Sequence, residues 1–297
     1  MADKFTFSQY KAQFPNDDAC LEAILQRRYG NAEACPDCGI VGKLTKIAGR
    51  RAYACKEGCH IYPCAGTIFE HSSTSLSLWF HAMYLMTATR NGVSAKELQR
   101  QLGVTYKCAW RIGHQLRILM NERAKQQIGG PLSGHVEVDE TFVGGRKSRS
   151  TMRRHGDKAS KAVVLGMAQR GGALVGKVVP STGKMRLIPE IMENVAPGSR
   201  ISSDEWNVYK RYLPQLGYKH SYVTHSADEY VRGDVHTNTL EGFWSHLKRG
   251  IRSTHVSVSK HHLQKYVDEF AFRFNNREAP AEMFHRLVRQ VSKALPC

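Results

Sequence analysis

The stretch "GHVEVDETFVGG", residues 134–145, alternates between apolar and polar residues, as a half-buried β-strand does. Val136 and Val138 would face one side of a sheet, and Glu137 and Asp139 the other. A carboxylate on a strand that is otherwise apolar needs a partner or a metal ion, because burial of an unpaired charge is costly. The strand is therefore the first expected element of the fold, and Asp139 the first candidate for a functional residue.

The segments after this strand predict further strands and helices. "AVVLGMAQ" and "GALVGKVV" have the composition of two strands joined by a hairpin at residues 170–172, and a helix is expected at about 183–194. "RISSDEW" indicates a buried strand that ends at Asp204, and "EWNVYKRYL" a helix beyond it. This order predicts an α/β domain with a mixed sheet. Acids at strand ends in such sheets often lie where ligands bind, although Asp204 taken alone is equally plausible as a helix N-cap.

The charge balance limits the class of partner. The 297 residues include 43 Lys+Arg and 26 Asp+Glu, a formal net charge of +17, which favours nucleic acid ahead of a membrane surface. A basic soluble protein without such a partner is the alternative. The N-terminus lacks the apolar core of a signal peptide, and the longest apolar stretch, "LSLWFHAMYLM", is too short to span a bilayer. We therefore expect a cytoplasmic protein without a membrane partner.

Five of the eight cysteines fall between positions 35 and 64. "CPDC" at 35–38 and "CKEGC" at 55–59 are typical of the two turns that hold Zn²⁺ between four thiolates. The longer spacing in the second turn leaves His60 and Cys64 as alternatives to Cys59. One structural Zn²⁺ is expected, because so short a segment cannot bury a core of its own. The predicted ligands are Cys35, Cys38, Cys55 and Cys59.

Residues 94–122, "SAKELQRQLGVTYKCAWRIGHQLRILMNE", have the pattern of a helix-turn-helix. Ser94 and Glu97 form a capping-box pattern, and the first helix should end near Gly103. The second helix, from about Thr105, would turn a polar face outward to reach phosphates and base edges in a major groove. Helix pairs joined by glycine turns also occur in cores that bind nothing. The residues expected on the outward face are Lys107, Arg111 and Gln115.

Residues 236–250, "HTNTLEGFWSHLKRG", predict an amphipathic helix with one carboxylate ahead of a basic end. Its apolar stripe would hold Leu240, Phe243, Leu247 and Ile251, and its polar stripe Glu241, Ser245, Lys248 and Arg252. Asn238 and Glu241 also fit a capping box, in which Asn238 is the cap and Glu241 only returns a hydrogen bond. For Trp206 and Trp244, core packing is favoured over stacking on bases.

Three blocks, "VDETFVGGRK", "SDEWNVY" and "HTNTLEGFWSHLKRGIR", resemble in order the signature blocks of bacterial insertion-sequence transposases of the DDE superfamily. The resemblance is to the ISXO-like group, which has an N-terminal zinc ribbon followed by a "GTIFE…LWF" segment, found here at 66–70 and 78–80. It extends from Cys35 to "FRFNNR" at 272–277.

This resemblance implies a ribonuclease-H-like fold in which Asp139, Asp204 and a third residue bind two Mg²⁺ or Mn²⁺ ions. Some relatives use Asn as the third ligand, so Asn238 is an alternative to Glu241. We favour Glu241 as the ligand, because a hard dication prefers an ionised oxygen, with Asn238 as an outer or shared ligand. The spacing of Glu241 and Lys248 matches the acid and the DNA-contacting base of the family.

The implied function is that of a transposase. Such an enzyme binds the terminal inverted repeats, cleaves DNA and transfers the strand to target DNA, as a homodimer or larger assembly associated with the nucleoid. A catalytically inactive DNA-binding regulator and a structure-specific nuclease are the competing hypotheses. The predicted DNA-binding residues are Lys107, Arg111, Gln115, Lys147, Arg153, Arg154, Arg249 and Arg252.

The expected domains follow from these motifs and from the Gly/Pro-rich boundary "IGGPLSG" at 128–134. They are a helical lead-in over 1–30, a zinc ribbon over 31–70, a helix-turn-helix region over 71–128 and a ribonuclease-H-like catalytic domain over 132–297.

Overall fold

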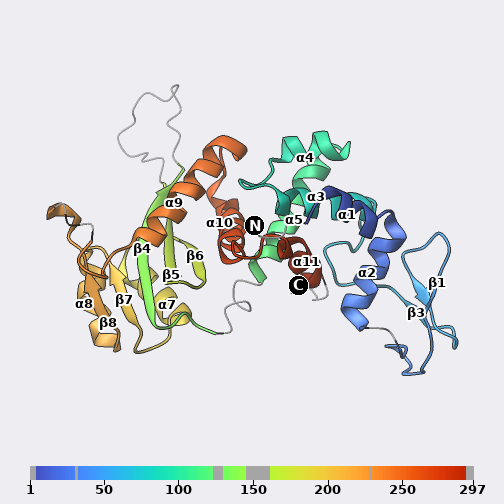
Figure 1. Cartoon of the computed structure of the whole chain (residues 1–297), viewed down its shortest axis with the longest axis horizontal. Coiled ribbons are helices and arrows are strands. Elements are labelled where there is room, and N and C mark those ends of the chain that lie inside the picture. Colours follow the sequence, from blue (N-terminus) through green and yellow to red (C-terminus); the bar gives the residue numbers. More distant parts are fainter. Residues whose placement is uncertain are drawn as a thin grey trace. The chain divides into compact units, whose positions relative to one another are not determined.

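The computed structural model describes residues 5–30, 33–122, 130–144, 161–227, 229 and 231–291 (Figure 1). The chain divides into two compact units, Met1–Leu119 with Glu278–Cys297, and Met120–Arg277. Three predicted DNA-binding residues, Lys147, Arg153 and Arg154, lie outside the described residues.

The first unit begins with two short helices and a small sheet. Helices α1 (Phe7–Gln13) and α2 (Asp17–Tyr29) start at the side-chain caps Thr6 and Asn16. An antiparallel sheet in the order β1-β2-β3 follows, formed by β1 (Thr45–Lys46), β2 (Tyr53–Ala54) and β3 (His60–Ile61).

Four helices complete the first unit: α3 (Leu76–Ala88), α4 (Ala95–Leu102), α5 (Tyr106–Glu122), which continues past the unit boundary at Leu119, and α11 (Glu282–Gln290). α11 packs on α3, where the ring of Phe284 contacts Phe14 and Phe80 with centroids 5.4 and 6.3 Å away. The second unit thus ends before α11, whereas the expected segment 132–297 includes it.

The predicted helix-turn-helix segment has the expected backbone. α4 ends at Gly103, whose left-handed conformation (φ 65°) suits glycine, and α5 begins three residues later. Ser94 accepts a hydrogen bond from the amide of Glu97, as in a capping box. The Glu97 carboxylate binds Arg100 and Gln101 instead of the cap backbone, so in the part of the chain described here only half of the box forms.

A five-stranded mixed sheet forms the centre of the second unit. Its order is β6-β5-β4-β7-β8; β4, β5 and β6 are antiparallel neighbours, whereas β7 runs parallel to β4 and β8 parallel to β7. The strands are β4 (His135–Val143), β5 (Ala162–Gln169), β6 (Leu174–Val179), β7 (Arg200–Ser203) and β8 (Lys219–Tyr222). The predicted mixed α/β fold is confirmed, and β8 is a strand that the sequence analysis missed.

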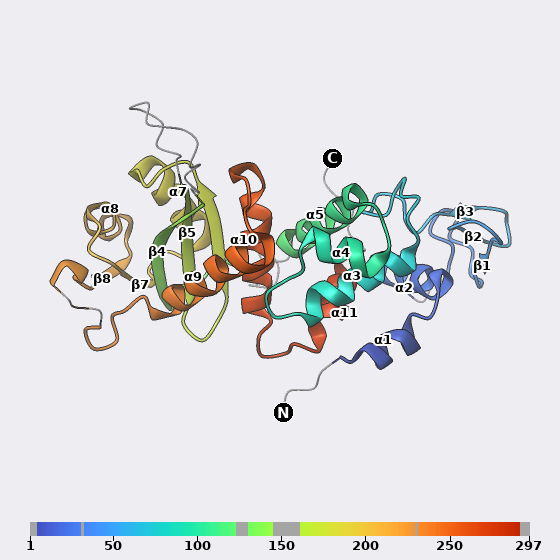
Figure 2. The ribbon, with the colours of Figure 1, turned by 90° about the horizontal axis from the view of Figure 1, so that it is seen from above.

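Helices cover both faces of this sheet. Val136 and Val138 of β4 pack in one cluster with α7 (Lys184–Asn194) and α8 (Asn207–Tyr212). On the other face lie α9 (Asn238–Gly250), which continues as a π-helical turn over Ile251–His255, and α10 (Lys260–Asn275). Figure 2 shows α9 crossing β4 and β5. The odd-numbered residues of β4 therefore face α9, as the alternation predicts.

The remaining short segments are the 3₁₀ turns Pro214–Leu216 and His225–Ala227. Among the helices that the structure describes, none combines the length and apolar character needed to cross a membrane.

Candidate functional site

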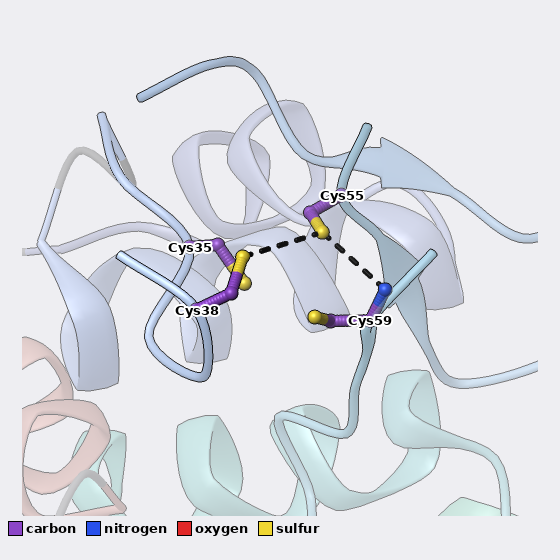
Figure 3. Close-up of side chains that lie close together, drawn as sticks. All are labelled: Cys35, Cys38, Cys55 and Cys59. Carbon is purple, nitrogen blue, oxygen red and sulfur yellow. Dashed lines mark hydrogen bonds between the residues drawn. The ribbon is translucent and has the colours of Figure 1, made fainter. Parts of the chain in front are cut away.

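A cysteine cluster lies at the small sheet of the first unit (Figure 3). The sulfur atoms of Cys35, Cys38, Cys55 and Cys59 all lie within 4.8 Å of one another. The Cys38 and Cys55 sulfurs are 3.9 Å apart, close to the distance of about 3.8 Å that follows from tetrahedral Zn–S bonds of about 2.3 Å. The donor set therefore fits one Zn²⁺. His60 and Cys64 are not part of the cluster, so Cys59 is the fourth member.

Backbone hydrogen bonds hold the two cysteine turns in place. Gly39 donates to the Cys35 carbonyl at 2.8 Å, and Gly58 donates to the Cys55 carbonyl at 3.1 Å. The Cys59 amide also donates to the Cys55 sulfur at 3.3 Å. Desolvation opposes ionisation of Cys55, but hydrogen bonds from the backbone of Cys59 and Glu57 and from neighbouring thiols outweigh it and lower the pKa of the Cys55 thiol to about 7. Such a thiol is readily available as a metal-binding thiolate.

In the second unit, the sheet register brings two predicted acids together. β4 and β7 are parallel, and Glu137 pairs with Ser202. Asp139 and Asp204 each lie two residues beyond this pair, Asp139 in the middle of β4 and Asp204 just past the end of β7. The Asp204 carboxylate accepts a hydrogen bond from the Trp206 amide at 3.0 Å, but the N-cap of α8 is Trp206 itself. The helix-cap alternative for Asp204 is therefore wrong.

Asp139 is a strongly perturbed carboxyl group. Burial raises its pKa to about 6, and the charges of Asp204 and Glu241 contribute in the same direction. The indole NH of Trp244 donates to its Oδ2 at 2.8 Å and opposes the shift. Three acids from β4, the end of β7 and α9 thus interact electrostatically, as a site that collects cations requires.

Glu140, the neighbour of Asp139, was not among the predicted residues. It points to the opposite face of β4, where the Tyr209 hydroxyl donates to its carboxylate. Burial raises its pKa to about 7, and Asp204 and Asp139 add to the shift. The alternation of a strand assigns Glu140 to the core, so its position beside the acids could not be read from the pattern.

The backbone at the start of α9 tests whether Asn238 and Glu241 form a capping box. The N-cap is Thr237, and Asn238 is the first helical residue, exposed, with its amide donating to His236 at 3.4 Å. The capping-box alternative is therefore wrong, because Asn238 does not occupy the cap position. Glu241 is exposed in the first turn and accepts a bond from the Thr237 hydroxyl at 3.4 Å.

The three acids are spaced more widely than the cysteines. Within the described ranges, the cysteine cluster is the only set of three or more such ligands whose atoms all lie within 4.8 Å. Ions of a two-metal site are about 4 Å apart, so ligands around them need not all touch one another.

A basic cleft of about 560 Å³ lies at the other end of α9. Its cations are Lys161, Lys248 and Arg252, and Phe142 provides a half-exposed aromatic wall. Lys248 and Arg252 also line a neighbouring shallow cleft with Arg249. The predicted apolar stripe of α9, Leu240, Phe243, Leu247 and Ile251, is buried, so the amphipathic pattern is confirmed.

The other predicted contact residues have mixed positions. Lys107 and Arg111 are exposed on α5, whereas Gln115 is half-buried and thus less available than the helical spacing predicts. Trp244 packs in the core as predicted, but Trp206 is 43% exposed. The core prediction for Trp206 is wrong, because α8 begins just after it and leaves its ring at the surface.

Comparison with known protein families gives a match in each of the two units. Residues 131–275 match the ISXO2-like transposase domain, and residues 15–61 match the transposase zinc-ribbon domain. These two matches confirm the expected resemblance to insertion-sequence transposases.

The individual relatives share less than 30% sequence identity with this chain. A Halobacterium salinarum protein, described as an uncharacterized protein in transposable element ISH50, is 28% identical over 278 residues, 88% of this chain and 91% of that protein. An uncharacterized transposase-like protein of Haemophilus influenzae is 29% identical over 116 residues, 39% of this chain and 90% of that protein. A structure of a pre-cleavage Mos1 transpososome covers 73% of this chain and 79% of that chain, with 13% identity and a TM-score of 0.27.

Proposed function

We propose that this protein is the transposase of an insertion sequence and that it cleaves and joins DNA at Asp139, Asp204 and Glu241. The observation that carries the proposal is the convergence of these acids from two parallel strands and a helix. Burial raises the pKa of Asp139, and the charges of Asp204 and Glu241 add to the shift. The match to a transposase domain over residues 131–275 supports the same reading.

The three carboxylates would hold two Mg²⁺ or Mn²⁺ ions, since hard dications prefer ionised oxygen ligands. Bound ions of this kind activate water or a 3′-hydroxyl for attack at phosphorus and stabilise the leaving oxygen. The protein's own contribution is to orient the acids. Trp244 fixes one oxygen of Asp139, and the Trp206 amide fixes one oxygen of Asp204.

The basic residues would bind the DNA substrate. Lys161, Lys248 and Arg252 would bind phosphates of the DNA that extends along α9 from the acids, and Arg249 would extend this contact. In the first unit, Lys107 and Arg111 would contact the terminal inverted repeat, with Gln115 making a smaller contribution. One structural Zn²⁺ at the cysteine cluster would hold the ribbon. Pairing of two transposon ends requires at least a dimer on DNA.

The test separates catalysis from binding. Wild type, Asp139→Asn and Asp204→Asn are incubated with labelled terminal-repeat DNA and Mg²⁺, and cut and joined strands are mapped. Each variant should lose cleavage by at least a thousandfold while binding the repeat within about twofold of wild type. Equal loss of binding and cleavage would contradict the division between the units. Cleavage by wild type without joining of a precut 3′ end would favour a nuclease.

The third acid is tested in the same assay with a matched pair. Glu241→Gln should abolish cleavage, because an amide is a weak ligand for a hard dication. Asn238→Ala should retain most cleavage, since a neutral amide adds little to the binding of a hard dication. The reverse result would assign the third position to Asn238. Lys248→Ala should weaken cleavage and lower the salt dependence of binding, as loss of a phosphate contact does.

A further inference from the structure

Glu137 is a fully buried carboxylate that the proposed reaction does not use. It lies on β4 two residues before Asp139, on the same face, with 0% of its surface exposed. One oxygen accepts hydrogen bonds from the amides of Thr239 and Leu240, at 2.9 and 3.3 Å. The other accepts from the Thr239 hydroxyl at 2.9 Å. A strand residue thus binds the first turn of a helix about a hundred positions later in the chain.

These contacts replace the cap that α9 lacks. The first amides of a helix have no partner within it, and they carry a partial positive charge. The N-cap residue of α9, Thr237, makes no side-chain cap bond. Glu137 satisfies two of these amides from outside the helix and places a negative charge at its N-terminus. Its position therefore fixes where α9 begins on the sheet.

Arg170 balances this charge and holds the segment that leads into α9. Its Nε donates to Glu137 at 3.1 Å. The same guanidinium donates to the backbone carbonyls of Asp234 and His236, the latter at 3.1 Å. His236 also lies beside the carboxylate, with Nδ1 3.4 Å from Oε1. A single arginine after β5 thus joins the carboxylate on β4 to the backbone just before α9.

We infer that Glu137 and Arg170 are a positioning pair that sets the distance between Asp139 and Glu241. The inference rests on the proposed function, because it concerns the same acids. Glu137 is two residues from Asp139, and its amide partner Leu240 is adjacent to Glu241. A shift of α9 along β4 would break these hydrogen bonds. Groups that orient metal ligands commonly change metal affinity by 10- to 100-fold when they are mutated.

The test needs a control that loses a buried glutamate elsewhere. Glu269 of α10 is also 0% exposed, and it pairs with Arg273 at 2.7 Å in the same unit. Glu137→Gln and Glu269→Gln are compared with wild type for melting temperature, terminal-repeat binding, Mn²⁺ affinity by calorimetry, and cleavage. Both variants should lower the melting temperature. Only Glu137→Gln should weaken Mn²⁺ binding by about tenfold or more and cleavage by about a hundredfold.

Each outcome decides the proposal. Equal Mn²⁺ affinity in the two variants, or an unchanged affinity in Glu137→Gln, would show that Glu137 is structural only. If Glu137→Gln does not fold, Arg170→Lys is used, since it keeps the charge but not the guanidinium contacts to both carbonyls; the same loss of Mn²⁺ affinity is expected, and wild-type affinity would overturn the pair. A wild type that neither binds Mn²⁺ nor cleaves would instead refute the proposed function.

Discussion

The cysteine cluster and the acid cluster are built in opposite ways. The four cysteines come from two turns between positions 35 and 59, and the backbone of each turn holds its own pair. The acids come from β4, from the end of β7 and from α9, spread from position 139 to position 241. The first site is local, and a Zn²⁺ bound there would supply folding energy. The acids of the second site are held by a sheet and the helices that pack on it.

The largest effect on stability is expected when one cysteine of the cluster is replaced. Cys38→Ser removes one thiolate, and a structural zinc in such modules contributes about 10–16 kcal/mol. We expect loss of bound zinc and rapid amide exchange over residues 33–61, with the sheet from β4 to β8 still protected. Hydrogen exchange and metal analysis measure both. Cys108→Ser, outside the cluster, is the control and should keep its zinc. Equal loss of protection in the sheet would remove the distinction between the two sites.

The acid cluster, in contrast to the cysteine cluster, should be sensitive to how tightly α9 packs on the sheet. Gly166 of β5 lies under α9, and a Cβ there would stand 2.5 Å from the Trp244 ring, whose indole holds Asp139. Gly166→Ala should therefore destabilise the protein by about 3 kcal/mol, through overpacking, and displace Trp244. Thermal unfolding measures the loss of stability, and the change in total tryptophan fluorescence relative to wild type reports the displaced ring. Gly242→Ala is the matched control, because nothing lies within 4 Å of its added methyl group. A melting temperature for Gly166→Ala at or above that of Gly242→Ala would mean that α9 adjusts freely.

The same contrast explains what the sequence could predict. Spacing predicted the four cysteines, because both turns are short and local, but it left His60 and Cys64 as alternatives to Cys59, and the fold decides for Cys59. Alternation and helical periodicity located β4, β5, β6, β7 and the buried stripe of α9. The meeting of Asp139 with Asp204 depends on the parallel register of β4 and β7, which no local pattern contains. It was expected only through the family resemblance.

Residues that act across long sequence separations were not identified. Glu137 was assigned to a polar face, but its partners on α9 and Arg170 are brought to it only by the fold. The half-paired capping box at Ser94 and the exposure of Trp206 also depend on the neighbouring side chains that the folded chain supplies. The strand β8 was missed because "KHSY" has no alternation of apolar and polar residues.

A pH dependence is expected for the sheet unit. Burial raises the pKa of Asp268 on α10 from 3.8 to about 7, although Gln264 and Lys177 oppose the shift. The folded state then holds the proton more tightly than the unfolded state, so stability falls as the pH rises from about 4 to about 7. Asp268→Asn should remove this loss and stabilise the protein at pH 8 by on the order of 2 kcal/mol.

The measurement is thermal unfolding of both proteins from pH 4.5 to pH 8. Lys177 and Glu190 line the same cleft as Asp268, so Glu190→Gln serves as the control. The gain from Asp268→Asn should shrink toward pH 4.5, where the aspartate is protonated in the folded protein. A gain that is constant with pH would show that its charge is not the cause.

The smallest effect concerns a local feature of the first unit. The Ser94 hydroxyl accepts a bond from the Glu97 amide at the start of α4, and Ser94→Ala should cost about 1 kcal/mol. Ser8 is exposed within α1 and Ser8→Ala should be neutral, because alanine favours a helix interior. Because the cap is local, exchange should increase in α4 and leave the amides of β4 unchanged. An increase that reached β4 would show that the two units unfold together, and the separation of a local site from an assembled one would then fail.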